Sequence, residues 1–490
     1  MYSINNAVFT YLISDKEPNT PFNNFIKIKS TKFNIYFSQN TQCHYSEDND
    51  YGIYVIGFCI DSNKELERKN IPEYLLKKLK SQNIFAKFLC ETDRLAGKFI
   101  ILIKRYDNLY LVGDATGTLP INYNLKNYFT ISSHEKIIAD ELGYEISNYS
   151  IKIRNGSDFS QPMPYNLTMY DNVKILLPGY FLNIKERKPQ RFFYPNNIML
   201  SRDQSLALIK NQILTISNIT KEYSKYYELI CPLTSGSDSR LNFAFLNKEG
   251  TNFKCFTFRH KFSSNSAELK IPNRICKEFK IEYEILNDLD VGAEKFNEIN
   301  KYIGAYQSKY TIDLALTYKS KFHDKALING DIIDQIGKSL IGNSLPNWTA
   351  SMYFFKAKLH NRERSILRDI KQHLSSISSR ELNKHKFDLF ALENRLGRWS
   401  SQTNNLYSLM GVNSLNIYNC RKIIFDWMRI PRTLRSANII HNTINDTINH
   451  KLKEYPFNQD SKFEWIKKRP FIFLIATYLK QLLFAKDKEY

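Results

Sequence analysis

The hydrophobic pattern of the chain changes near residue 200, and this change constrains the fold more than any other feature. Before it, short runs rich in β-branched and aromatic residues, such as residues 52–60 and 97–105, predict strands. After it, residues 203–223 have helical spacing, and strand-like runs then alternate with helical ones, as in a parallel sheet with crossover helices. We therefore expect a β-rich domain over residues 1–195 and an α/β domain over residues 205–490.

The length and the cysteine pattern set the broad class. A chain of 490 residues is too long for one compact core and agrees with two or three domains. No apolar run reaches the roughly 18–20 residues of a membrane-spanning helix, and the N-terminus lacks the pattern of a secretory signal peptide. The seven cysteines are scattered and form no Cys-x-x-Cys pair, so we expect buried free thiols in a reducing cytoplasm.

The net charge of +20 favours polyanionic partners such as nucleic acid, anionic glycan or acidic lipid. The positive charge is spread along the whole chain without a zinc-finger or RNP-like motif, so we expect no specific nucleic acid partner. Residues 465–490 combine Lys467, Lys468 and Arg469 with an apolar stripe at helical spacing. Two interpretations stay open: peripheral contact with an anionic membrane, or a last helix docked on the C-terminal domain.

A polar loop separates two apolar segments of the expected C-terminal domain. Residues 227–233 predict a buried strand, and residues 239–250 predict a helix that ends at Gly250. Small loop residues leave backbone N–H groups accessible at a helix N-terminus, where the helix dipole favours anions such as phosphate. Asp238 fits such a loop as a ligand of Mg²⁺ that bridges to the phosphates. From spacing alone, a nucleotide site and a plain polar turn both remain open.

Two acidic loops carry a resemblance to a known family. The stretch LTSGSDSR (residues 233–240) resembles the pyrophosphate loop of the asparagine synthetase family, whose usual form is Ser-Gly-Gly-x-Asp-Ser. The stretch LINGDIIDQIGK (residues 327–338) resembles the family's second motif, Gly-Glu-Gly-x-Asp-Glu. The resemblance implies that ATP and Mg²⁺ bind between the loops, with Asp238 and Asp334 as the metal ligands. It assigns nucleotide contacts to Leu233, Thr234, Ser235, Gly236, Ser237, Asp238, Ser239 and Gly330.

Several positions depart from the motifs of that family. Ser235 stands where the first motif has a Gly, and Asp331 stands in the second motif for the Glu that assists catalysis. Ile332 and Gln335 replace a Gly and the final Glu. Pro232 is also unusual in a central strand, because it removes a ladder hydrogen bond. These departures keep open a degenerate, non-catalytic scaffold as the alternative to an enzyme.

The N-terminal domain is similar to the class II glutaminase domain of the same family. That domain works through an N-terminal Cys, whose thiolate attacks the glutamine amide. This chain begins Met-Tyr-Ser, so we expect no glutaminase chemistry. An intact scaffold without the nucleophile is similar to the β-lactam synthetases and lasso-peptide cyclases, which join a carboxylate to an amine. The positions of this chain that match the motifs of the class II glutaminase domain are Asp114, Gly117, Pro120, Ser132 and Ser133.

The resemblance implies an N-terminal Ntn-type β-sandwich flanked by helices, and a doubly wound parallel-sheet ATP-pyrophosphatase domain with a helical extension. It implies a cytoplasmic ligase that adenylates a carboxylate, such as a sugar acid or a peptide side chain, for attack by ammonia or an amine. Its catalytic residues would be Asp331 and a Lys near the C-terminus, by spacing Lys462, with Lys467 and Lys468 behind it. Arg240 would either meet an anionic substrate group or open the helix and face solvent. A basic peripheral-membrane or glycan-binding partner in surface polysaccharide assembly is a further alternative.

Overall fold

The structure is a computed structural model, and most of the chain is described. The described residues are 7–19, 24–30, 32–126, 128–155, 163–193, 198–259, 266–287, 292–303, 307–339, 373, 375, 382–456, 469, 471, 472 and 475. Lys462, Lys467 and Lys468 therefore lie outside the described residues, as do the first six residues of the chain. Within the described part, no helix combines the length and the apolar character needed to cross a membrane.

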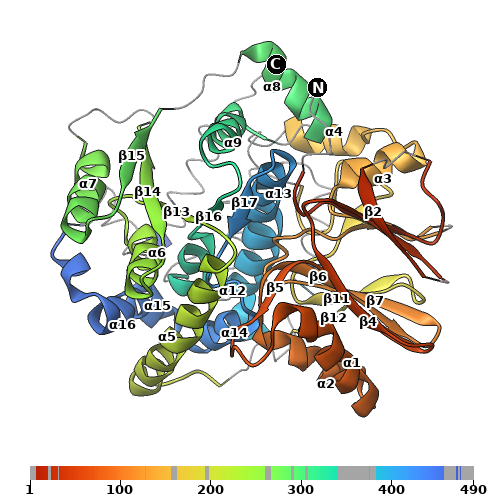
Figure 1. The fold of residues 1–490 in the computed structure, drawn as a ribbon, viewed down its shortest axis with the longest axis horizontal. Coiled ribbons are helices and arrows are strands. Elements are labelled where there is room, and N and C mark those ends of the chain that lie inside the picture. Colours follow the sequence, from red (N-terminus) through yellow and green to blue (C-terminus); the bar gives the residue numbers. More distant parts are fainter. Residues whose placement is uncertain are drawn as a thin grey trace.

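Two six-stranded antiparallel sheets form the N-terminal half (Figure 1). The first has the order β10-β8-β9-β1-β3-β2 and the second β12-β11-β7-β6-β5-β4. The strands of the first sheet are β1 (Tyr11–Ser14), β2 (Phe25–Lys29), β3 (Asn34–Ser38), β8 (Asn122–Asn124), β9 (Thr130–Ser132) and β10 (Lys174–Ile175). Those of the second are β4 (Cys43–Glu47), β5 (Tyr51–Asp61), β6 (Leu95–Arg105), β7 (Asn108–Gly113), β11 (Tyr180–Asn183) and β12 (Lys188–Arg191).

Alternation of side chains along the strands explains why the two sheets pack face to face. Successive residues point to opposite faces, and Tyr54 and Ile56 of β5 share one core with Tyr11 and Ile13 of β1. The intervening Val55 belongs to a second core on the outer face. That outer face is covered by α1 (Ile71–Ser81) and α2 (Phe85–Cys90), and α3 (Glu135–Leu142) packs on the outer face of the first sheet. The predicted sandwich of sheets flanked by helices is confirmed.

The C-terminal half contains a five-stranded parallel sheet with the order β15-β14-β13-β16-β17. The chain starts at the central strand, adds two strands on one side, and returns to add two on the other. This is the doubly wound arrangement that the sequence predicts, and the direction of winding reverses between β13 and β16. The strands are β13 (Leu229–Pro232), β14 (Phe253–Phe258), β15 (Tyr283–Leu286), β16 (Ala326–Ile328) and β17 (Asn413–Leu415).

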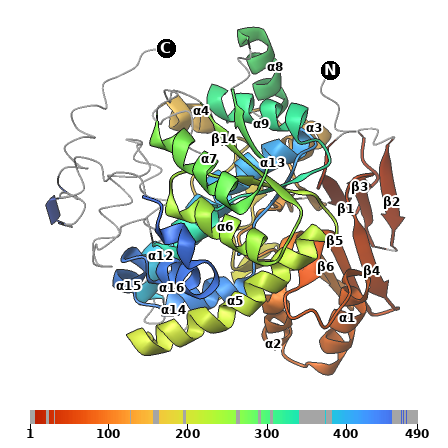
Figure 2. The same ribbon diagram turned by 60° about the vertical axis from the view of Figure 1, so that its left-hand side comes forward.

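Helices cover both faces of the parallel sheet (Figures 1 and 2). Cys231 of β13 packs with the helices of one face, whereas its neighbour Ile230 packs with those of the other. The helices of the first face are α5 (Arg202–Ser224), α6 (Ser237–Lys248) and α7 (Ala267–Phe279), and those of the second are α8 (Ala293–Ile303), α9 (Lys309–Lys321) and α13 (Ser401–Leu409). Because residues of both halves belong to one continuous core, the two halves form a single packed body.

The boundary between the halves lies between β12 and α5, whose first turn is closed by a capping box. The Ser201 hydroxyl accepts from the Gln204 N–H, and the Gln204 side chain accepts from the Ser201 N–H. The remaining helices are α4 (Asn148–Asn155), α12 (Lys386–Phe390), α14 (Arg421–Arg429), α15 (Arg432–Ser436) and α16 (Ile439–Ile448). All seven cysteines are free, and five of them are buried, as the sequence predicts, whereas Cys43 is half-buried and Cys90 is exposed.

A candidate nucleotide site at the switch point of the parallel sheet

The two acidic loops lie at the carboxyl ends of adjacent strands. Strands β13 and β16 pair in parallel, with Ile230 opposite Leu327, so the loops that follow them leave the sheet side by side. A methyl group placed on Gly330 would lie 3.9 Å from Cβ of Asp238. Because winding reverses between these strands, the loops border the crevice in which open α/β sheets bind ligands.

The first loop closes on itself before α6 begins. The Thr234 N–H donates to Ser239 Oγ (3.0 Å), and the Gly236 N–H donates to Thr234 Oγ1 (3.1 Å). The Ser235 N–H donates to the carboxylate of Glu268 (3.1 Å), at the start of α7. Helix α6 starts after Gly236 without a side-chain cap, and the first N–H groups of a helix have no partner within the helix. The donors left for an anion are therefore those of the first turn of α6.

Asp238 is held by two side chains from distant parts of the chain. Lys338 Nζ lies 2.7 Å from one carboxylate oxygen, and His441 Nε2 lies 2.6 Å from the other. Burial acts to raise the pKa of Asp238, but the hydrogen bond and charge of His441 and the charge of Lys338 outweigh it and hold the pKa below its usual value. Burial lowers the pKa of His441, and its hydrogen bond to Asp238 acts in the opposite direction. The Asp238 side chain retains 26% of its exposure.

The second loop contributes two carboxyl groups with raised pKa values. Burial is the main cause at both Asp331 and Asp334, and each pKa is about 6. The negative charge of Asp238 raises the pKa of Asp334 further. Asn416 Nδ2 donates to Asp331 (2.8 Å), and Gln335 Nε2 donates to Asp334 (2.7 Å). Gln335, which replaces an acid of the family motif, thus acts as a partner of Asp334.

The arrangement fits Mg²⁺ as an ion shared with phosphate. Asp238 and Asp334 lie close enough for one to shift the pKa of the other, and a divalent cation would relieve that repulsion. Within the described chain, no group of three or more His, Cys, Asp or Glu residues can hold a metal ion. Mg²⁺ is commonly held by one or two carboxylates together with substrate phosphates and water. Lys338 is the positive charge that such an ion would displace from Asp238.

The structure corrects the prediction for Arg240, which neither faces solvent nor reaches the site. Its side chain is fully buried, and its guanidinium donates to the carbonyls of Ser235 (2.9 Å), Leu452 (3.2 Å) and Tyr455 (2.8 Å). Arg240 therefore ties the first loop to the end of the described C-terminal region. Leu233, the residue after β13, is also fully buried, and its N–H donates to the Phe256 carbonyl (2.8 Å).

The motif residues of the N-terminal half lie in the turn after β7 and at the end of β9, and Asp114 of this turn contacts the C-terminal half through Asn419. Asp114 accepts hydrogen bonds from backbone N–H groups of its own turn. Gly117 has a φ of 66°, in the left-handed region that favours glycine. Ser132 Oγ donates to the Tyr11 carbonyl (2.7 Å), and Ser133 Oγ accepts from the Tyr11 N–H (3.2 Å). These residues serve the fold of the domain, and the N-terminal residues that bear on a nucleophile lie outside the described part.

Three features of the site could not be found by motif comparison. Lys338 is the last residue of the second motif, and its sequence context does not predict that it pairs with Asp238. His441 lies on α16, 203 residues beyond Asp238, with no local signal. Glu268 opens α7 as an ordinary first-turn acid. In the tail, Ile472 and Ile475 are exposed, and the rest of the predicted apolar stripe lies outside the described residues.

Comparisons with known proteins assign no family. No family model and no curated protein matches the chain. One similar solved structure is glutamine phosphoribosylpyrophosphate amidotransferase from B. subtilis complexed with ADP and GMP, at 14% identity and a TM-score of 0.24, covering 57% of this chain and 60% of that one. Another, described as the allosteric regulatory enzyme of purine biosynthesis, has 11% identity and a TM-score of 0.25, covering 62% and 74%. These scores are too low to assign a fold or a function.

Proposed function

We propose that the chain binds ATP at the switch point and uses it to activate a carboxylate substrate for amide formation. A carboxylate oxygen of the substrate attacks the α-phosphorus, and pyrophosphate leaves. Ammonia or an amine then attacks the acyl carbon, loses a proton, and releases AMP. The observation that carries this proposal is the convergence of Asp238 and Asp334 at the carboxyl ends of adjacent strands, beside the uncapped first turn of α6.

The chemistry of each residue suggests its role in the proposed reaction. The first-turn N–H groups of α6 donate to phosphate oxygens, aided by the helix dipole. Mg²⁺, held by Asp238 and Asp334, would neutralise charge on the phosphates. Lys338, released from Asp238, would add positive charge beside them. Asp331, whose pKa of about 6 suits a base near neutral pH, would take the proton of the attacking amine; Lys462 stays the expected cation from the C-terminal region.

Equilibrium binding of ATP in excess MgCl₂ tests the site directly. We expect saturable binding by the wild type and at least roughly tenfold weaker binding by Asp238→Ala and by Asp334→Asn, because each removes charge that holds the ion. Asp446→Ala is the matched control, since it removes an acid from α16 whose partners are His450 and Lys453. The absence of saturable binding up to about 10 mM ATP would end the proposal.

The products of turnover test the chemistry. Wild-type protein is incubated with ATP, MgCl₂ and a small-molecule cell extract that contains carboxylates and amines. We expect AMP and pyrophosphate in equal amounts, and their loss in Asp238→Ala. Formation of ADP and phosphate instead would point to a kinase or an ATPase and would contradict adenylation.

A second candidate function is a non-catalytic, nucleotide-sensing scaffold, and a specific observation favours it. Both oxygens of Asp238 are engaged by Lys338 and His441, and the Ser235 N–H is engaged by Glu268. Side chains of the protein itself thus already pair with groups that would bind the metal ion and the phosphates. ATP binding without pyrophosphate release in any extract would support the scaffold over the ligase.

A further inference from the structure

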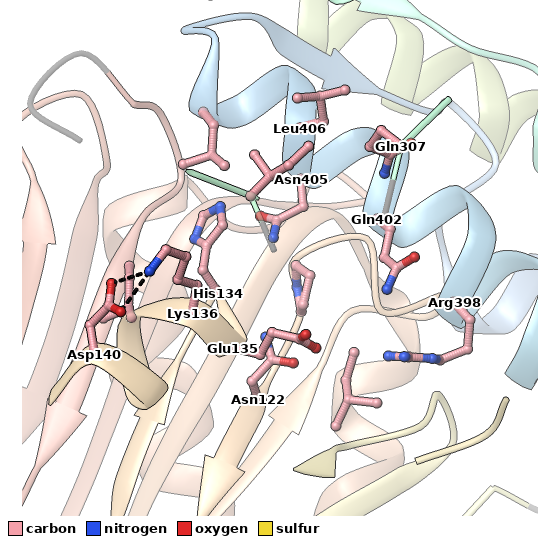
Figure 3. Close-up of a pocket in the computed structure, with 15 residues that line it drawn as sticks. Asn122, His134, Glu135, Lys136, Asp140, Gln307, Arg398, Gln402, Asn405 and Leu406 are labelled. Carbon is pink, nitrogen blue, oxygen red and sulfur yellow. Dashed lines mark hydrogen bonds and ion pairs between the residues drawn. The ribbon is translucent and has the colours of Figure 1, made fainter. Parts of the chain in front are cut away.

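A cavity lies at the junction of the two halves, apart from the switch-point site. It has a volume of about 90 Å³, several times the 10–15 Å³ or so that one water molecule needs. One wall comes from α3 and the edge of the first sheet, and the other from α13 and the π-helical segment Ala391–Ser400 before it (Figure 3). The lining residues that carry the argument are His134, Glu135, Arg398, Gln402 and Asn405.

Arg398 brings an unsatisfied donor to this cavity. Its side chain is 1% exposed. Nε donates to the Met163 carbonyl (3.0 Å) and Nη2 to the Leu167 carbonyl (2.6 Å), whereas Nη1 has no hydrogen-bond partner within the described chain. In Figure 3 the guanidinium points from the C-terminal half towards Glu135 across the cavity. A buried N–H without an acceptor is unfavourable, so the site favours a ligand oxygen at this point.

His134 adds a second donor from the opposite wall. Burial lowers the pKa of His134 to about 3, so the ring is neutral. Its Nδ1 lies 2.8 Å from Ser133 Oγ, which already accepts from the Tyr11 N–H. The Ser133 hydroxyl therefore donates to Nδ1, and the ring proton is on Nε2. In the described chain Nε2 has no hydrogen-bond partner of good geometry, although a contact with the backbone of Asn405 acts to raise the pKa of the ring.

The cavity also presents an acceptor and negative charge. The Asn405 amide donates to the Ser133 carbonyl (3.1 Å), and its Oδ1 has no partner among the described residues. Burial lowers the pKa of Arg398 to about 10, and the charge of Glu135 acts in the opposite direction, so the two side chains place opposite charges on facing walls. The Glu135 carboxylate also accepts from the Met169 N–H (3.2 Å). The rest of the lining includes five aliphatic side chains, Ile137, Ile175, Ile303, Leu406 and Leu409.

We propose that this cavity binds a small aliphatic α-amino acid as its zwitterion. The carboxylate faces Arg398 and His134, the ammonium group faces Glu135 and Asn405, and the side chain lies against the aliphatic wall. A simple anion would leave Asn405 Oδ1 without a donor, and a simple amine would leave Arg398 Nη1 without an acceptor. The site shares no motif residue with the proposed nucleotide site and adds a second ligand to the chain.

The test compares three probes of one size by calorimetry on the full chain. L-Alanine carries both charged groups, propanoate lacks the amine, and L-alaninamide lacks the carboxylate. We expect L-alanine to bind saturably and each analogue to bind roughly tenfold or more weakly, because each leaves buried polar groups unpaired. L-Valine and L-leucine extend the series along the aliphatic wall. If propanoate binds as tightly as L-alanine, the site takes an anion and the proposal is wrong.

Substitutions in the cavity wall test whether L-alanine binds there. Gln402→Phe places a larger apolar side chain in the cavity, and Asn405→Leu removes the acceptor; each is expected to weaken L-alanine binding by roughly tenfold. Thr403→Ala, on the same helix but outside the lining, is the control and should bind as the wild type does. Asp238→Ala should also leave this binding unchanged, which separates it from the nucleotide site. No saturable binding of any of the amino acids up to about 10 mM, or equal binding by Gln402→Phe and the wild type, would overturn the proposal.

Discussion

Asp114 and Asp238 both follow a strand in a family-like motif, yet the two halves of the molecule hold them in different ways. Asp114 is 2% exposed and accepts from the backbone N–H groups of Thr116 (3.1 Å), Thr118 (2.9 Å) and Leu119 (2.9 Å). Asn419 of the C-terminal half adds a fourth hydrogen bond (3.0 Å). Backbone donors cannot move without unfolding the turn, so this aspartate fixes the fold at the junction.

Among the described residues, the hydrogen-bond partners of Asp238 are the side chains of Lys338 and His441, and Asp238 stays partly exposed. Side chains can change rotamer and exchange one partner for another without a change in the backbone. The comparison teaches that a motif aspartate held by the backbone is an anchor, whereas one held by side chains can exchange those partners for a ligand. Four predictions test this distinction, from the largest expected effect to the smallest.

The largest effect is expected at the anchor. Asp114→Ala leaves three N–H groups and the Asn419 amide without their acceptor, and we expect it to lower the free energy of unfolding by about 3–5 kcal/mol. Asp238→Ala should lower it by less than about 1 kcal/mol, because Asp238 and its partner Lys338 are both partly exposed. Urea unfolding followed by circular dichroism measures both. Equal losses in the two variants would show that the distinction is false.

Lys98 offers a second test at the junction of the halves. Its side chain is fully buried and donates to Ser408 Oγ (2.6 Å) and the Asn404 carbonyl (3.1 Å). Burial lowers the pKa of Lys98 to about 7 in the folded state, against about 10.4 in the unfolded chain. Between these values the unfolded state binds the extra proton, so stability from this group rises as the pH rises from about 7 to about 10.

The measurement for Lys98 is the difference in unfolding free energy between the wild type and Lys98→Met across that pH range. We expect the difference to move in favour of the wild type by about 2–3 kcal/mol from pH 7 to pH 10. Using the difference removes the contribution of tyrosines and other lysines, which both proteins share. A flat difference would mean that Lys98 keeps its ordinary pKa and that the junction is open to water.

Much of the fold was predictable because local pattern and tertiary burial agree. The run at residues 52–60 lies within β5 and that at 97–105 within β6, since both strands are covered on both faces and so are mainly apolar. The predicted helix at residues 203–223 is α5, with its cap at Ser201. Pro232 is tolerated in a central strand because it is the last residue of β13.

The candidate site was predictable only where its residues are close in sequence to a strand end. Asp238 and Asp334 follow β13 and β16, so the parallel pairing brings them together. The partner of Asp238 on α16, His441, depends on how the helical extension packs, and no local pattern encodes that. The burial of Arg240 has the same origin, since two of its acceptors, the carbonyls of Leu452 and Tyr455, lie more than 200 residues away.

The third prediction concerns how much the ionised carboxylate of Asp334 lowers the stability of the folded protein. The pKa of Asp334 is about 6 in the folded state, against about 3.9 in the unfolded chain. The folded state binds the proton more tightly, so stability is lost as the pH rises from about 4 through 6. Asp334→Asn should therefore raise the free energy of unfolding at pH 7 by about 1–2 kcal/mol, and the gain should vanish below about pH 4.

Urea unfolding at pH 7 and at pH 4 measures this gain. A variant that is more stable yet binds ATP more weakly would show that Asp334 is kept for a ligand rather than for the fold. Loss of stability in Asp334→Asn would instead place Asp334 with Asp114 among the anchors and would break the comparison between the two halves.

The smallest effect is expected for Lys338, the side chain that a ligand would displace. Lys338→Met removes a half-buried ion pair with Asp238, so the free energy of unfolding should change by less than about 1 kcal/mol. The charge of Lys338 lowers the pKa of His441, and its removal should therefore raise that pKa, measurable from the ring signals by NMR titration. Lys453→Met is the control. It breaks an ion pair with Asp446, which lies on α16 with His441, and it should leave the pKa of His441 unchanged. If Lys338→Met destabilises the protein as strongly as Asp114→Ala does, Lys338 is part of a fixed scaffold, and the site is not one that opens to a ligand.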